Sequence, residues 1–123
     1  MIDIAQARNE IERREAAQHD RNLARCCAAQ QDFERIKARI IEKYRPVRIW
    51  QWGSLLDPHR FDETSDIDLA VEGVTDATTW FALLGDAMML TRFSLDVVQL
   101  ERMEPEFAAT IREKGRIVYE RKC

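Results

Sequence analysis

The chain has 123 residues, which fits one domain and leaves little room for a second. Its 19 basic and 22 acidic residues give a net charge of −3, which argues against a nucleic-acid module that neutralises many phosphates. No apolar run approaches the roughly 20 residues that span a bilayer, and the charged N-terminus lacks the apolar segment of a signal peptide. We therefore expect a cytoplasmic protein without membrane association, whose three cysteines are ordinary reduced thiols.

The N-terminal part of the chain is predicted to be helical, because its first 45 residues contain neither Gly nor Pro and are rich in Ala, Arg, Glu and Gln. The second part of this stretch carries an apolar stripe at helical spacing, formed by Phe33, Ile36, Ile40, Ile41 and Tyr44. The first part has few apolar residues, so we expect either two helices or one long bent helix over about residues 3–44. Pro46 ends it, because proline disfavours a helical residue before it.

This contrast in composition predicts an N-terminal helical extension, residues 1–30, followed by a folded domain, residues 31–123. The extension has two interpretations. It is either a solvated helix or an arm that pairs with another chain, in a homodimer or a hetero-oligomer.

Two strands are predicted next, over residues 47–52 and 66–71. The first strand is closed by Gly53 and Ser54, and a loop over residues 55–65 leads to the second. This strand–turn–loop–strand order places a glycine turn close to the start of an acidic strand.

An apolar helix is predicted over residues 77–90, with Asp76 as its N-cap. The residues that we place on its buried side are Trp80, Phe81, Leu84 and Met88. The remaining elements are a strand over residues 93–100, a helix over about 104–114 with Gly115 as its C-cap, and a short strand over 117–119. The order predicts an α/β (α+β) fold, in which helices flank a small mixed β-sheet.

Three aspartates indicate a candidate metal site. Asp66 and Asp68 are two residues apart on a predicted strand, so both side chains point to the same face. Asp96 supplies a third carboxylate if its strand is a neighbour. Like charges held together repel, and a cation between them is the natural compensation. Oxygen ligands without a His or Cys cluster suit Mg²⁺ or Mn²⁺, and the set fits a two-metal site for phosphoryl transfer.

Gly53 and Ser54 supply the phosphate side of the predicted site. Glycine lets the backbone approach a triphosphate closely and permits positive φ. Backbone N–H groups at such a turn, together with the Ser54 hydroxyl, can hold β- and γ-phosphates. Gly-Ser alone and Asp-x-Asp alone are both common, but their combination with a later strand Asp is much more specific.

Four other residues have two interpretations each. Trp50 and Trp52 share one face of their strand, and packing on the sheet is favoured over stacking on a nucleobase. Lys114 and Arg116 lie near a helix C-terminus, where a favourable contact with the helix dipole is preferred over a contact with phosphate.

The run from Trp52-Gly53-Ser54 to Ser65-Asp66-Ile67-Asp68-Leu69-Ala70-Val71 resembles the signature of the DNA polymerase beta-type nucleotidyltransferase superfamily. The small size resembles its minimal nucleotidyltransferases, the MNT proteins often encoded beside HEPN toxins. The resemblance covers about residues 33–120 and implies a nucleotidyltransferase fold. It also implies Mg²⁺-dependent transfer of a nucleoside monophosphate from an NTP, with Asp66, Asp68 and Asp96 as catalytic metal ligands, Asp96 also helping to activate the acceptor hydroxyl, and Gly53 and Ser54 on the nucleotide.

Two departures from the family pattern fall on the nucleotide side. The segment from Leu55 to Ser65 has eleven residues, one more than is usual in the family, and Leu55-Leu56-Asp57 stands where the family often carries Arg. His59 or Arg60 is the alternative source of this cation, and both also fit ordinary solvated loop residues.

The resemblance implies an antitoxin that uses ATP to adenylylate a hydroxyl on a HEPN-type toxin. Two alternatives remain open. The chain is a binding protein that neutralises a toxin by covering it, or an enzyme that modifies a small molecule. The last alternative is less favoured, because it normally needs a second domain or a dimer to build an acceptor pocket.

Overall fold

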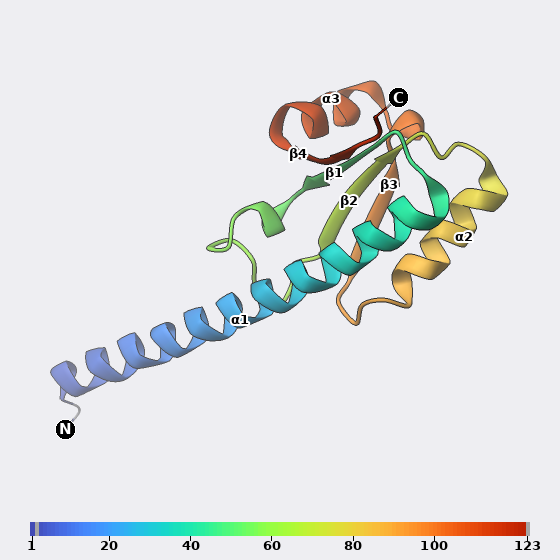
Figure 1. Ribbon diagram of the computed structural model, residues 1–123. Coiled ribbons are helices and arrows are strands. Elements are labelled where there is room, and N and C mark those ends of the chain that lie inside the picture. Colours follow the sequence, from blue (N-terminus) through green and yellow to red (C-terminus); the bar gives the residue numbers. More distant parts are fainter. Residues whose placement is uncertain (2, 123) are drawn as a thin grey trace.

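The computed structural model describes residue 1 and residues 3–122 (Figure 1). The elements, in chain order, are α1 (Ile4–Tyr44), β1 (Arg48–Trp52), the short 3-10 helix η1 (Ser54–Leu56), β2 (Ile67–Glu72), α2 (Ala77–Met88), β3 (Leu95–Gln99), the 3-10 helix η2 (Leu100–Arg102), α3 (Pro105–Lys114) and β4 (Arg116–Glu120). The predicted α+β fold, with a mixed sheet, flanking helices and a long N-terminal helix, is confirmed.

The four strands form one mixed sheet in the order β3-β2-β1-β4. Strand β1 is antiparallel to both β2 and β4, whereas β2 and β3 are parallel and are connected through α2. In this register Asp68 of β2 lies between Trp52 of β1 and Asp96 of β3. The order of strands therefore brings together residues from three separate parts of the sequence.

Helices cover the two faces of the sheet unequally (Figure 1). We call the face under α1 and α2 the core face, and the face under α3 the carboxylate face. The main apolar cluster fills the core face; its members include Phe33, Ile36, Ile49, Leu69, Val71 and Leu83. A smaller cluster lies between the carboxylate face and α3 and consists of Trp50, Ala70, Leu100, Ala108 and Ile111. Alternation along each strand sends successive side chains to these two different environments.

Helix α1 is one helix of 41 residues, not two. The Asp3 side chain caps its first turn by accepting hydrogen bonds from the backbone N–H groups of Ala5 and Gln6. The helix ends at Tyr44, and Arg45 follows in the left-handed conformation with φ 48°. Cys26 is the first buried residue of α1, and the preceding turns extend beyond the sheet (Figure 1). The division of the chain at residues 30 and 31 therefore falls inside a continuous helix, and stays a prediction.

The exposed turns of α1 have local support. The Glu10 carboxylate accepts hydrogen bonds from the side chains of Arg13 and Arg14, at the (i, i+3) and (i, i+4) spacings that stabilise isolated helices. Although α1 is long, no helix within the described ranges is apolar enough over a sufficient length to cross a membrane. Cys26 and Cys27 are free thiols, and Cys123 lies outside the described residues.

The prediction for the buried side of α2 is wrong in part. Trp80 is buried and Leu84 is half-buried, but Phe81 and Met88 are exposed. Besides Trp80, the buried residues of the helix are Leu83 and Ala87. This helix carries apolar residues on more than one side, so its periodicity alone does not say which side packs on the sheet. Its end at Met88 and the bounds of β3 are each within two residues of the predicted positions.

Candidate active site

The two carboxylates in the strands lie beside each other on the carboxylate face. Asp68 is the second residue of β2, and its register partner in the parallel strand is Asp96. Both belong to the alternating set that includes Ala70, whereas Leu69 points to the core face. Asp66 comes immediately before β2 and is exposed. Residues far apart in sequence thus meet at the end of β2 and β3 where both strands begin.

Asp68 is the most buried of the three carboxylates, with a relative exposure of 8%. Within the described part of the chain, none of the side-chain hydrogen bonds or ion pairs reaches its carboxylate, although burial normally demands a partner. Burial first, and then the negative charges of Asp96 and Asp66, together raise the pKa of Asp68 to about 7. The pKa of Asp96 is also raised, first by burial and then by Asp66. The three carboxylates therefore act on one another electrostatically.

The chemistry of these donors fits a hard divalent cation, since all three are carboxylates and a cation would offset the repulsion between them. The geometry is less complete. Over residue 1 and residues 3–122, no three His, Cys, Asp or Glu side chains are grouped closely enough to form a ready-made metal site. The assignment of Asp66, Asp68 and Asp96 as metal ligands therefore stays a prediction.

Gly53 brings the turn that was predicted to bind phosphate against the carboxylates. It has φ 80° and ψ −162°, a conformation that is essentially restricted to glycine. A Cβ atom built on Gly53 would lie 2.9 Å from Cγ and 3.2 Å from Cβ of Asp68, and closer still to a carboxylate oxygen. The backbone of the turn therefore packs directly against the buried carboxylate. A glycine is needed here for both its dihedral angles and its size.

Ser54 follows at the start of η1, whose first turn is closed by hydrogen bonds from the backbone N–H groups of Leu56 and Asp57 to the carbonyl oxygens of Gly53 and Ser54. Leu55, in the middle of η1, is buried in the main apolar cluster and fixes this short helix to the core. The Gly53-Ser54 turn is thus held from both sides, by Asp68 and by Leu55.

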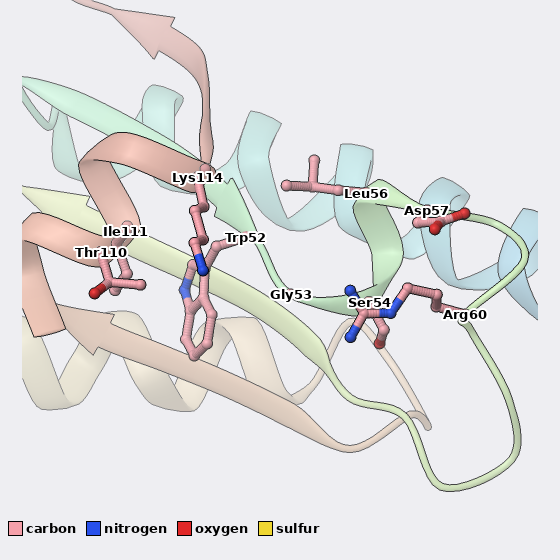
Figure 2. Close-up of a pocket in the computed structure, with 10 residues that line it drawn as sticks. Trp52, Gly53, Ser54, Leu56, Asp57, Arg60, Thr110, Ile111 and Lys114 are labelled. Carbon is pink, nitrogen blue, oxygen red and sulfur yellow. The ribbon is translucent and has the colours of Figure 1, made fainter.

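A cavity of about 410 Å³ opens beside this turn (Figure 2). It is lined by Trp52, Gly53, Ser54, Leu56, Asp57, Arg60, Thr110, Ile111, Lys114 and Gly115. Figure 2 shows the Arg60 side chain directed toward Ser54, and the Lys114 side chain next to the indole of Trp52. Cations from two distant elements therefore reach the same cavity, which gives it the charge that a polyphosphate would need.

His59 and Arg60, the two alternative sources of a cation in the loop, have different surroundings in the structure. Arg60 lines the cavity, whereas the His59 ring is stacked on the ring of His19 in α1, with 5.7 Å between centroids and 6° between planes. Glu63 also approaches Arg25 of α1, with 3.8 Å between oxygen and nitrogen. The loop is thus attached to α1 by one side and presents Arg60 to the cavity from the other.

Two residues line this cavity although the sequence favoured other roles for them. Contact with the helix dipole was preferred for Lys114 and packing on the sheet for Trp52, with phosphate and nucleobase contacts as the alternatives. Trp52 is half-buried, and its indole Nε1 is a buried donor with no acceptor among the described residues. The structure brings Lys114 to this cavity through the pairing of Arg116 with Gln51, the neighbour of Trp52, and no signal in the sequence indicated that pairing.

The fold and the site together define a nucleotidyltransferase domain, with acidic residues at the start of two neighbouring strands of a mixed sheet and a glycine turn against them. Residues 34–123 match the family model described as "Polymerase beta, Nucleotidyltransferase", and the chain belongs to this family. A search of the curated proteins gave no match.

Proposed function

We propose that the protein transfers a nucleoside monophosphate from an NTP to a hydroxyl group on a partner protein. The nucleotide that we propose is AMP, transferred from ATP. In this proposal the partner is a HEPN-type toxin and the transfer inactivates it, so the chain acts as an antitoxin. Membership of the nucleotidyltransferase family supports nucleotidyl transfer in general. The resemblance of this small chain to the MNT proteins supports the protein acceptor and the antitoxin role.

The observation that carries the proposal is the contact between Gly53 and the carboxylate of Asp68. This contact joins a turn suited to phosphate with a carboxylate suited to a cation, so a triphosphate on the turn would lie beside Asp68. The cavity next to the turn adds the side chains of Arg60 and Lys114. Asp66 and Asp96 are exposed, which leaves the site of the three carboxylates accessible to an acceptor as large as a protein.

The reaction follows from these positions. The β- and γ-phosphates bind at Gly53 and Ser54, and Arg60 and Lys114 balance their charge. An acceptor hydroxyl oxygen attacks the α-phosphorus in line, and the bond from that phosphorus to the bridging oxygen breaks. Pyrophosphate leaves, and the hydroxyl proton goes to the Asp96 carboxylate. The chain contributes mainly by positioning the reactants.

Asp66, Asp68 and Asp96 would hold Mg²⁺ or Mn²⁺. When bound, the ion would neutralise charge on the phosphate oxygens and would make the acceptor hydroxyl easier to deprotonate. The raised pKa of Asp68 supports this assignment, since a cation would offset both the burial of this carboxylate and its repulsion by Asp96 and Asp66.

A direct test incubates the purified full chain with α-labelled ATP, Mg²⁺ and a HEPN-type protein as the candidate partner, with GTP, CTP and UTP in parallel. We expect label on the partner and an added mass of one or more nucleoside monophosphates. The variant Asp66→Asn/Asp68→Asn is expected to transfer nothing measurable. The control Asp20→Asn, the same substitution on the exposed part of α1, is expected to transfer label as the wild type does. Absence of transfer by the wild type, or equal transfer by the double variant, would contradict the proposal.

A second function is supported by two observations: the loop that lacks the usual Arg, and the absence of a ready-made three-ligand group within the described residues. In this alternative the chain neutralises the toxin by binding it. Rescue of cells that express the toxin distinguishes the two functions. Full protection by Asp66→Asn/Asp68→Asn means that binding is enough, whereas loss of protection with retained complex formation supports catalysis.

A further inference from the structure

Helix α2 presents an apolar surface to solvent. Phe81 is 69% exposed, Met88 is 66% exposed and Met89, which caps the helix, is 85% exposed. Phe81 and Met88 are seven residues apart, so they lie on the same side of the helix, with Gly85 between them. Large apolar side chains that gather on one exposed face typically mark a binding surface. Methionine suits such a surface, because its flexible side chain adapts to different partners.

Gly85 gives this surface a notch. A Cβ atom built at Gly85 would meet no other atom of the described residues within 4 Å, so no contact among them requires a glycine there. Glycine inside a helix costs about 1 kcal/mol relative to alanine. The open position between Phe81 and Met88 leaves room for a side chain of a helix that packs against α2 from outside.

Each end of the surface carries an arginine, and its centre is neutral. Arg102 lies next to Phe81 around one hollow, and Arg92 lies next to Met89 around another. Neither guanidinium takes part in a side-chain hydrogen bond or ion pair within the described ranges. The acidic residue of α2, Asp86, is already held by Lys43 and Tyr44 of α1. The surface therefore has unpaired positive charge at both ends and no free negative charge between them.

We propose that this face of α2 docks a helix of another protein, in which an apolar stripe is flanked by acidic residues at both ends. The apolar stripe would cover Phe81 and Met88 and fill the notch at Gly85, and the acids would meet Arg92 and Arg102. A second copy of this chain fits poorly. In an antiparallel α2 pair Arg92 faces Arg102, and in a parallel pair each arginine faces its own copy, so like charges meet in both arrangements.

The docking surface lies on the core face side of the molecule, opposite the carboxylates (Figure 1). A partner bound there would leave the cavity and the three carboxylates uncovered. The docking proposal therefore goes beyond the transfer reaction and does not depend on it, because binding can be measured on a chain that transfers nothing.

The test uses the full chain and two synthetic helical peptides with the same leucine stripe, one ending in glutamates on both sides and one in lysines. Binding is followed by fluorescence anisotropy at low salt. We expect the glutamate peptide to bind about tenfold or more tightly than the lysine peptide. Phe81→Ser/Met88→Ser should weaken its binding about tenfold or more, because the apolar stripe is lost. The control Phe107→Ser, which changes a similarly exposed aromatic residue on α3, should leave binding unchanged.

The charges are tested separately with Arg92→Glu/Arg102→Glu, which should reverse the preference and favour the lysine peptide. Thermal melting of each variant confirms that it remains folded. Equal binding of the two peptides by the wild type, or undiminished binding by Phe81→Ser/Met88→Ser, would overturn the proposal. So would sedimentation that shows a wild-type dimer converted to a monomer by the same double variant, because the surface would then belong to a second copy.

Discussion

The two faces of the sheet differ in almost every physical respect. The core face is fully covered by α1 and α2, and residues such as Phe33 and Leu69 have no exposed surface there. The carboxylate face is covered by the short helix α3 over only part of its area, and at its open end it holds the buried carboxylate of Asp68 and the unpartnered indole N–H of Trp52. The core face holds the larger of the two apolar clusters and therefore contributes more to the free energy of folding. The other keeps polar groups incompletely satisfied, as expected where a charged ligand binds.

The largest effect should come from the core face. Replacing the fully buried Phe33 by Ala is expected to lower the free energy of unfolding by about 3–5 kcal/mol, since it removes an aromatic ring and leaves a cavity. Urea unfolding measures this, with Phe107→Ala as the exposed control, for which we expect about 0.5 kcal/mol or less. The transfer activity of the remaining folded Phe33→Ala molecules should be unchanged. A loss of activity per folded molecule would show that the faces are not separate.

Gly53→Ala should affect the carboxylate face next most strongly. The left-handed φ of Gly53 is strained for alanine by about 1–3 kcal/mol, and the new methyl group would displace the Asp68 carboxylate. A shift of this kind in a catalytic group is expected to reduce nucleotidyl transfer about a hundredfold. Gly85→Ala is the matched control, because its methyl group meets nothing, and it should raise stability slightly. Near-normal transfer by Gly53→Ala would contradict the close contact with Asp68.

The pH dependence of stability should distinguish the faces next. The pKa of Asp68 rises from its ordinary value of 3.8 to about 7 on folding, so the folded chain keeps a proton that the unfolded chain releases. The stability that this carboxyl contributes is complete below about pH 4, falls as the pH rises and is lost above about pH 7. Asp68→Asn should therefore match the wild type near pH 4 and exceed it by about 1–3 kcal/mol at pH 8.

The measurement is urea unfolding of both proteins from pH 4 to pH 8. A stability difference that stays constant over this range would contradict the assignment. At pH 8, added Mg²⁺ should stabilise the wild type and leave Asp68→Asn nearly unaffected, since the ion compensates the charge that the variant lacks.

The smallest effects concern the cavity. Arg60→Ala and Lys114→Ala should each weaken NTP binding about tenfold, because each removes one charge-assisted contact with phosphate. Isothermal titration with a non-hydrolysable NTP measures the loss. His59→Ala and Arg112→Ala are the controls from the same loop and the same helix, since neither residue lines the cavity. Equal weakening of NTP binding by His59→Ala and Arg60→Ala would mean that binding depends on the conformation of the loop and not on the charge of Arg60.

The spacing of a few residues predicted much of this arrangement. Leu69 and Val71 pack in the core while Asp68 faces away from it, which follows from alternation along a strand alone. The pairing of the strands and the positions of the helices on the sheet could not be predicted from residue spacing. The position of Asp96 opposite Asp68 depends on which strands pair, and the entry of Lys114 into the cavity depends on how α3 crosses the sheet. The exposed side of α2 was missed because an apolar residue looks the same to periodicity whether it packs inside or binds outside.

The single long helix at the N-terminus has a practical consequence in solution. At about 1.5 Å per residue, a helix of 41 residues is roughly 60 Å long, although the whole chain weighs only 14.4 kDa. Such an elongated particle tumbles and migrates more slowly than a sphere of the same mass. In gel filtration a single chain would elute early, at the position of a larger species. Its assembly state is therefore best measured by light scattering or sedimentation equilibrium, which report mass independently of shape.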